Sequence, residues 1–219
     1  MSDLYLRKRI NQHFNAIAPD PPETHVLELE NAIQDYLDTP MSVVCVNTAT
    51  SALQLSIAAL DIGAGDEVLV PSLTYVASFQ AISASGATPV ACEIDRDTFF
   101  LDVDDARNKI TDKTKAIMPV HYASSSSNMH AVYDLAQEFN LRVIEDAAQA
   151  LGVKYKTKFA GTFGDCGGYS FYGNKIITSG EGGAIVTNNR KIRDEIYKLK
   201  NHGREKKGIF IHKSVGFNF

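Results

Sequence analysis

The chain has 219 residues, of which 44% are hydrophobic, so it is long enough and apolar enough to bury a sizeable core. Its formal net charge of −4 comes from scattered acidic residues, and we therefore expect neither nucleic acid nor a membrane surface as a partner. The charged N-terminus carries no signal sequence, and no apolar run reaches the roughly 18 residues of a spanning helix, so we expect a cytoplasmic protein acting on small solutes.

The first part of the chain, residues 1–40, differs from the rest. Pro21 and Pro22 interrupt it, and an amphipathic pattern over 24–37 predicts a helix outside the main fold. From residue 43 onward, short β-branched runs alternate with helical patterns, which predicts an α/β fold with a mostly parallel sheet sandwiched by helices. The predicted strands are 43–46, 67–70, 89–94, 116–120, 142–144, 168–172 and 184–187. The predicted helices are 51–60, 75–84, 129–139 and 190–199.

The cysteines and the chain end complete this outline. Cys45, Cys92 and Cys166 are odd in number, far apart and set among apolar residues, which indicates reduced structural thiols rather than disulfides or a metal site. Residues 213–219 end the sequence without a cap or a closing helix, so we expect a chain that is part of a longer protein.

A single lysine marks the first candidate site. Lys175 lies in 167–183, GGYSFYGNKIITSGEGG, where one predicted strand leads through a glycine-bounded turn towards the next. An amine held against an apolar, glycine-rich wall is easily desolvated, and its neutral form can make a Schiff base. A loop lysine that points into water fits this segment equally well.

Asp146 ends the apolar strand predicted at 142–144, and the sequence predicts that the chain then switches into a helix. Ligands of open α/β sheets bind at the carboxyl ends of strands, and a carboxylate there can keep a pyridine nitrogen protonated. On this segment alone, an N-cap aspartate is the better interpretation. Gln149, one turn further on, would face the same ligand or the solvent.

Two further segments have the features of a phosphate site and a stacking site. Thr50 and Ser51 follow the predicted strand 43–46 at the start of a helix, where hydroxyls and free N–H groups can hold a phosphate or simply cap the helix. Tyr75 follows the strand 67–70 and could stack on a flat heterocycle or fill the core. Neither a dinucleotide glycine motif nor G-x-x-x-x-G-K-[ST] occurs. All of these signals fall at strand ends or turns of one sheet.

With these residues in view, the sequence resembles the DegT/StrS sugar aminotransferases, which are pyridoxal 5′-phosphate (PLP) enzymes of fold type I, the aspartate aminotransferase fold. The motifs that carry the resemblance lie at 22–24, 47–53, 63–75, 119–122, 144–149, 170–183 and 201–204. The resemblance implies that residues 1–219 form the PLP-binding large domain, with an N-terminal helical segment over about 1–40, and that the C-terminal small domain is absent from this chain.

Carried over residue by residue, the resemblance implies a Schiff base on Lys175, a pyridine-nitrogen partner in Asp146 and a stacking ring in Tyr75. Gln149 would face the phenolic oxygen of the cofactor. The residues that match the family's phosphate contacts are Thr50, Ser51, Ser170 and Asn218. Asn218 falls in a G-x-N motif that reaches the neighbouring subunit's phosphate, so the resemblance implies a homodimer with shared active sites.

The implied reaction is transamination: an amino donor, glutamate by resemblance, supplies the amine that a keto sugar nucleotide then accepts. The turn around Lys175 is most similar to enzymes that aminate a 4-keto-6-deoxy sugar, and a dehydratase branch carries histidine where Lys175 stands. Ala49 and residues 124–128 depart from the family pattern, which leaves their substrate contacts open. A non-catalytic regulator with this fold and a plain nucleotide-binding domain without PLP are the alternatives.

Overall fold

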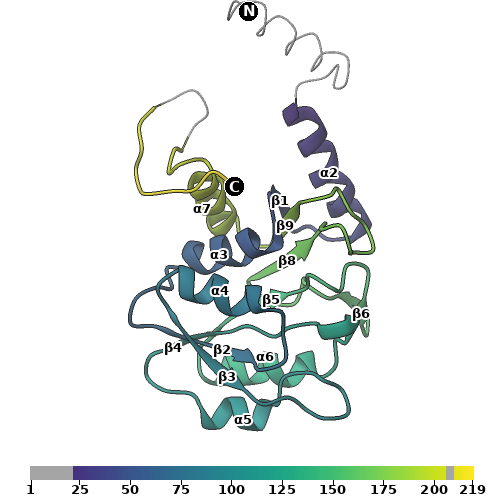
Figure 1. The fold of residues 1–219 in the computed structure, drawn as a ribbon, viewed down its shortest axis with the longest axis vertical. Helices are drawn as coiled ribbons and strands as arrows, with labels where there is room; N and C mark the ends of the chain where they lie inside the picture. Colours follow the sequence, from purple (N-terminus) through teal and green to yellow (C-terminus); the bar gives the residue numbers. More distant parts are fainter. Residues whose placement is uncertain (1–21, 206–209) are drawn as a thin grey trace, which may run out of the picture.

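The protein is described here by a computed structural model of residues 22–205 and 210–219 (Figure 1). Its centre is a seven-stranded sheet in the order β1-β9-β8-β5-β4-β2-β3. The strands are β1 (Ser42–Val46), β2 (Glu67–Pro71), β3 (Thr88–Cys92), β4 (Thr114–Ile117), β5 (Arg142–Asp146), β8 (Cys166–Ser170) and β9 (Gly183–Thr187). Strand β9 is antiparallel to both of its neighbours, and the pairs from β8 through β5, β4 and β2 to β3 are parallel. The predicted mostly parallel α/β sheet is confirmed.

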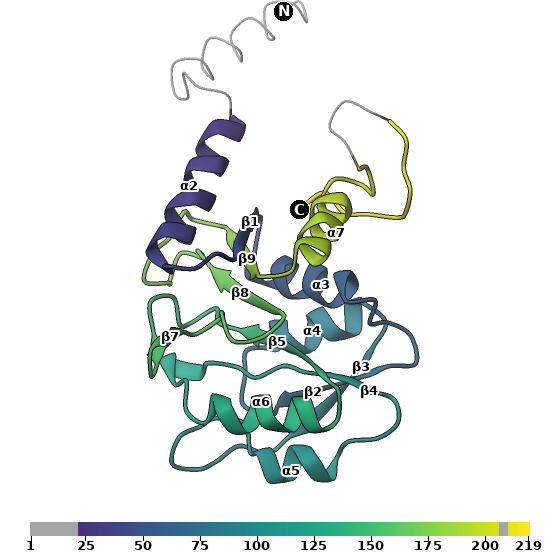
Figure 2. The same cartoon turned by 180° about the vertical axis from the view of Figure 1, so that it is seen from behind.

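Helices cover both faces of the sheet (Figures 1 and 2). One face packs against α3 (Ala49–Ala59), α4 (Val76–Ala84) and α7 (Arg190–Lys200). The other face packs against α2 (Pro22–Tyr36), α5 (Val103–Asn108) and α6 (Met129–Glu138). The long predicted helices are therefore all present. Helix α2 packs into the core through Ile33, as does Leu37 directly after it, rather than lying outside the fold.

Side chains of the central strands alternate between these two helical layers, as a doubly covered sheet requires. On β5, Ile144 packs under α3 and α4, whereas Val143 packs towards α5 and α6. Two-residue periodicity therefore puts Asp146 on the α3 and α4 side and Glu145 on the opposite side.

The structure corrects the sequence prediction in several places. No helix follows Asp146: residues 147–152 form turns, with Gly152 at φ 86°, and lead into the short hairpin β6 (Lys154–Tyr155) and β7 (Lys158–Phe159). Helix α5 is also absent from the prediction. It is only six residues long and begins with an Asp102 cap rather than with an apolar repeat. Several strands lie two or three residues from their predicted bounds.

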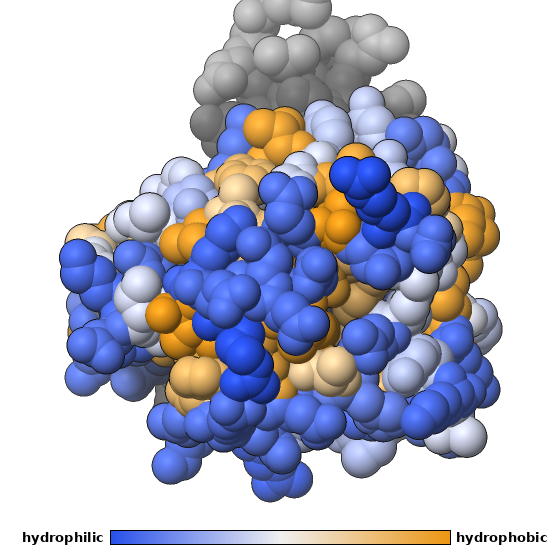
Figure 3. Space-filling model, turned by 90° about the horizontal axis from the view of Figure 1, so that it is seen from below, coloured by the Kyte–Doolittle hydropathy of each residue, from blue (hydrophilic) through white to orange (hydrophobic). Residues whose placement is uncertain are grey.

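The outer surface beyond α5 is well solvated. Viewed from that end, hydrophilic side chains cover most of the face, and apolar side chains interrupt it in small groups (Figure 3). Within the described ranges, no helix combines the length and apolar character needed to span a bilayer.

Candidate active site

A cavity of about 430 Å³ opens at the carboxyl ends of β5 and β8, beside the N-termini of α3 and α4. The residues expected from the sequence that line it are Thr50, Tyr75, Asp146, Gln149, Ser170 and Lys175. Its position agrees with the rule that open α/β sheets bind ligands at their carboxyl edge. Its volume lies within the range of small-molecule and cofactor sites.

Lys175 lies on the 171–182 loop that connects the antiparallel strands β8 and β9, as predicted. The loop is folded back on itself: the hydroxyl of Thr178 and the amide of Ser179 both donate to the Phe171 carbonyl, each at 3.0 Å. Lys175 is half-buried and borders a second cavity of about 320 Å³ as well as the first. Lys175 thus lies between two cavities at the carboxyl edge of the sheet.

The close approach of this loop to α3 depends on glycine. A Cβ on Gly183 would stand 2.5 Å from the carbonyl carbon of Thr48, and Gly182 has a φ of 151° that side-chain-bearing residues rarely adopt. Backbone contact between the two segments closes one wall of the cavity.

Asp146 lies at the floor of the cavity and is 6% exposed. One carboxylate oxygen accepts from the Ser78 hydroxyl at 2.6 Å, and the other accepts from the Ala148 amide at 3.1 Å. The Ser78 hydroxyl is in turn 2.7 Å from that of Thr74. These donors fix the orientation of the carboxylate, and since no helix follows, the interpretation of Asp146 as an N-cap is wrong.

Two helix N-termini face the cavity, which favours an anionic group. Thr48 caps α3: its hydroxyl oxygen accepts from the Ser51 amide at 3.0 Å and lies 2.9 Å from the Ser51 hydroxyl. Ser51 is thereby turned towards its own cap and does not line the cavity, whereas Thr50 does. Tyr75 caps α4 at the cavity rim and is 71% exposed, so it is no core aromatic.

Gln149 has a defined orientation, since its side-chain oxygen accepts from the Ala123 amide at 2.9 Å. A backbone N–H bonds only the oxygen, so the amide nitrogen is the donor left for the cavity. The basic lining residue in the described part of the chain is Lys175, and the acidic ones are Asp146 and Glu181. The donors, the single cation and the exposed ring together fit a phosphorylated pyridine.

Asn218 stands apart from this cluster. It is exposed and pairs with Asn201 in an isolated bridge, and it lines neither of the two cavities at Lys175.

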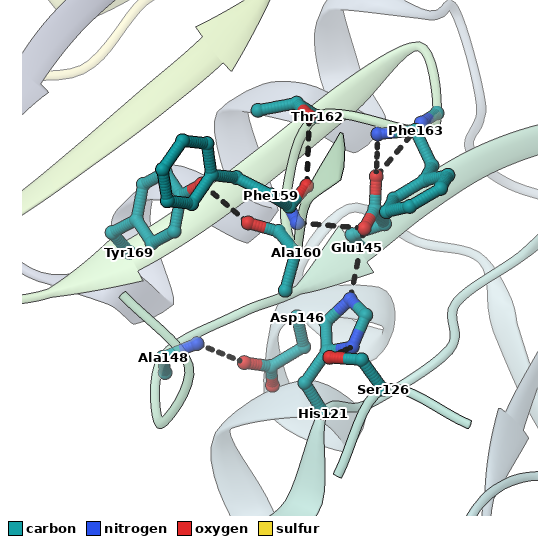
Figure 4. Close-up of polar contacts among 12 residues, drawn as sticks. His121, Ser126, Glu145, Asp146, Ala148, Phe159, Ala160, Thr162, Phe163 and Tyr169 are labelled. Atoms are coloured by element: carbon teal, nitrogen blue, oxygen red, sulfur yellow. Dashed lines mark hydrogen bonds and ion pairs between the residues drawn. The ribbon is translucent and has the colours of Figure 1, made fainter. Parts of the chain in front are cut away.

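The sequence prediction missed Ser78, His121 and Glu145. Ser78 lies three residues after Tyr75, a helical spacing that could have indicated a shared face with the site. Glu145 and His121 are fully buried and paired behind Asp146, His121 Nε2 lying 2.8 Å from Glu145 Oε2 (Figure 4). A glutamate inside an apolar strand, such as Glu145, indicates that the carboxylate has a buried hydrogen-bond partner, but the sequence does not indicate which residue that partner is.

Comparison with known proteins identifies the group to which this arrangement belongs. Residues 19–219 match the model of the DegT/DnrJ/EryC1/StrS aminotransferase family. The chain belongs to this family. Relatives include a GDP-perosamine synthase of Caulobacter vibrioides, 44% identical over 194 residues that make up 89% of this chain and 52% of the relative. A GDP-perosamine synthase of Escherichia coli O157:H7 is 47% identical over 174 residues, 80% of this chain and 48% of the relative.

Solved structures of aminotransferases have the same fold. DesV of S. venezuelae, in complex with a ketimine intermediate, aligns with a TM-score of 0.86 and 35% identity over 97% of this chain and 58% of its own. A Bacillus subtilis protein, NtdA with bound cofactor PMP, aligns with a TM-score of 0.84 and 29% identity over 100% of this chain and 50% of its own. The resemblance to this family and the fold type I assignment are confirmed, and the PMP bound to NtdA agrees with PLP as the expected cofactor.

The chain spans about half the length of the curated relatives it matches. Membership of an aminotransferase family contradicts the alternative interpretation of the chain as a plain nucleotide-binding domain without PLP.

Proposed function

We propose that residues 1–219, of which 1–21 and 206–209 lie outside the described residues, form the cofactor-binding large domain of a PLP-dependent sugar nucleotide aminotransferase. The observation that carries the proposal is that a half-buried lysine on a strand-connecting loop and a buried carboxylate at a strand end line one cavity. Two helix N-termini at the same cavity favour the cofactor phosphate. The GDP-perosamine synthases among the relatives support the substrate class.

When bound, PLP supplies an electron sink for negative charge at a substrate carbon. Lys175 would hold the cofactor through its aldehyde carbon, and its amine is the group proposed to move a proton at the substrate carbon. Asp146, held by Ser78 and Ala148, would keep the pyridine nitrogen protonated. Tyr75 at the rim has the exposed ring needed for stacking.

The other polar residues of the cavity would bind the phenolic oxygen and the phosphate of the cofactor. The Gln149 amide nitrogen would donate to the phenolic oxygen, since its own oxygen is occupied. Thr50 and Ser170 would bind the phosphate, and Ser51, which bonds Thr48, would act mainly by ordering the first turn of α3. Asn218, exposed and outside the cavity, is free to reach the phosphate of a second subunit, consistent with a homodimer.

For the substrates, we propose a nucleotide-linked keto sugar, with a GDP-linked 4-keto-6-deoxy sugar favoured, and glutamate as the amino donor. The names of the relatives support the nucleotide and the sugar class. The lysine at position 175, rather than histidine, supports amine transfer over dehydration. A cytoplasmic location suits a nucleotide sugar as substrate.

The test is chemical trapping of the cofactor. The protein is incubated with PLP, reduced with borohydride and digested, and the modified peptide is sequenced by mass spectrometry. We expect the adduct on Lys175 and an absorbance band of the lysine-bound cofactor that is lost in Lys175→Ala. We expect amine transfer from glutamate to the keto sugar nucleotide by the wild type but not by Lys175→Ala. Lys191→Ala, at an exposed position on α7, is the matched control and should behave as wild type.

A stable adduct on another lysine would overturn the role of Lys175. An adduct on Lys175 with no turnover of any amino donor, in a protein that includes every domain of its relatives, would favour the non-catalytic regulator.

A further inference from the structure

A buried polar network lies directly behind the candidate active site, on the other side of the sheet from the cavity. Its centre is Glu145, whose carboxylate accepts four hydrogen bonds in a fully buried setting. The donors are the amides of Gly161 (2.7 Å), Phe163 (2.6 Å) and Gly164 (2.7 Å) and the ring of His121 (2.8 Å). Because a carboxylate only accepts, His121 Nε2 carries the proton in this contact.

His121 connects this pair to the site in two ways. Its backbone amide donates to the Asp146 carbonyl at 3.0 Å, and the Asp146 amide donates to Pro119 at 2.9 Å, so the end of β5 is held between two residues of one segment. The His121 side chain returns to Glu145, the neighbour of Asp146, which closes a ring of contacts. Figure 4 shows the carboxylate of Asp146 directed towards Ala148, away from that of Glu145.

The second connection runs through the 122–126 turn. Ser126, itself buried, bonds His121 Nδ1 at 3.0 Å and so ties the end of the turn to its beginning. Within the turn, Ala123 and Ser124 have left-handed backbones, with φ of 47° and 66°, which non-glycine residues keep only when their surroundings impose them. The same two residues hold Gln149: the Ala123 amide binds its side-chain oxygen, and the Ser124 hydroxyl binds its carbonyl at 2.8 Å.

We propose that His121 and Glu145 are positioning residues for the candidate active site, because their buried pair holds the 122–126 turn that orients Gln149 and fixes the strand end that carries Asp146. This inference rests on the proposed function for its effect on the cofactor. The proposed positioning itself does not need the cofactor. A network that served only stability would not have to reach Gln149 through a strained turn.

The test compares Ser126→Ala and His121→Phe with the matched control Thr187→Val. Thr187 is equally buried, and its hydroxyl donates to the Asp165 carbonyl at 2.7 Å and accepts from the Asn189 amide at 3.3 Å, on β9 away from the turn. The control therefore removes at least as many hydrogen bonds as Ser126→Ala. Hydrogen exchange of the cofactor-free protein is measured over peptides covering 122–128 and 147–150. We expect exchange in both peptides to accelerate about tenfold in the two network variants and to stay unchanged in Thr187→Val. His121→Phe risks misfolding, and Ser126→Ala, which deletes one hydroxyl, keeps the test decisive.

PLP affinity gives the second measurement, through a double-mutant cycle with Gln149→Leu. We expect Ser126→Ala to weaken PLP binding several-fold in the wild type and to have little further effect once Gln149 is replaced. If the effects of Ser126→Ala and Gln149→Leu on PLP affinity were additive, the network would not act through Gln149 and the proposal would be overturned. Equal acceleration of hydrogen exchange in Thr187→Val would overturn it as well, because the network would then contribute only to stability. If the wild type forms no adduct on Lys175, the proposed function fails, and the exchange experiment still decides the positioning.

Discussion

Replacing Asp146 by asparagine separates the structural role of this residue from its proposed chemical one. The substitution keeps the shape of the side chain and one acceptor oxygen, which can still bind the Ala148 amide. The new amide nitrogen faces the Ser78 hydroxyl, which can turn to accept from it while donating to Thr74. The buried hydrogen bonds are therefore kept, but Ser78 becomes the acceptor in its bond to residue 146.

The two expected magnitudes differ widely. The two hydrogen bonds to the charged carboxylate become bonds to a neutral amide, which weakens them, while the cost of burying a charge disappears. We therefore expect the free energy of unfolding to fall by only about 1 kcal/mol. Loss of the charged partner of a buried pyridinium is expected to cost about 3–5 kcal/mol. At 1.36 kcal/mol per factor of ten, that loss slows the reaction with an amino donor by roughly 10²–10⁴-fold.

The assays are urea unfolding of the cofactor-free protein and the spectral change of the PLP-loaded protein after mixing with glutamate. Ser78→Ala is the control, because it removes one donor to Asp146 and leaves the charge in place; we expect it to be slowed far less. A near-normal rate in Asp146→Asn would refute the pyridine-nitrogen role. A loss of several kcal/mol in unfolding free energy would mean that the carboxylate is primarily structural.

Three further predictions follow from other parts of the structure. Burial raises the pKa of Cys45 to about 12 and that of Cys92 to about 11, from 9.0, so iodoacetamide should label both thiols slowly at pH 8 until the protein unfolds. Because unfolded thiols release protons that folded ones keep, stability in unfolding experiments should also fall as the pH rises above about 9. Gly183→Ala should weaken PLP binding in a spectral titration at least tenfold, since its Cβ would meet the Thr48 backbone at 2.5 Å. Sedimentation should show that PLP promotes association of two chains and that Asn218→Ala reduces this response; an unchanged response would exclude the cross-subunit contact.

The fold was largely predictable because each long element carries a local signal. After Glu67, strand β2 reads as an unbroken apolar run, and residues 68–71 are buried on both faces, as such runs predict. Helix α6 shows apolar residues at helical spacing, and Val132 and Leu135 are buried where that spacing places them. Helix α5 and the turns after Asp146 lacked such a signal. There, an aspartate cap, a left-handed glycine and contacts with distant segments determine the backbone.

Six of the predicted site residues line one cavity, whereas Ser51 and Asn218 do not, and the contacts that hold the site together were not predictable. Lys175, Asp146 and Tyr75 each end or connect a strand, and parallel strands bring such positions to one edge whatever their order in the chain. Contacts such as that between Ser78 and Asp146, 68 residues apart, depend on which helix lies over which strand. Periodicity within a segment carries no information about that pairing.

The alternation of side chains along β5 explains why a catalytic candidate and a buried, hydrogen-bonded carboxylate are neighbours in sequence. Asp146 faces the cavity, while Glu145 faces the apolar layer on the other side of the sheet. A bare carboxylate there would be costly, so three backbone amides and His121 surround it. Those amides belong to the 161–164 segment, which has to fold around Glu145 for the end of β5 to be stable. The architecture thereby ties the position of a cavity residue to a loop on the far face of the sheet.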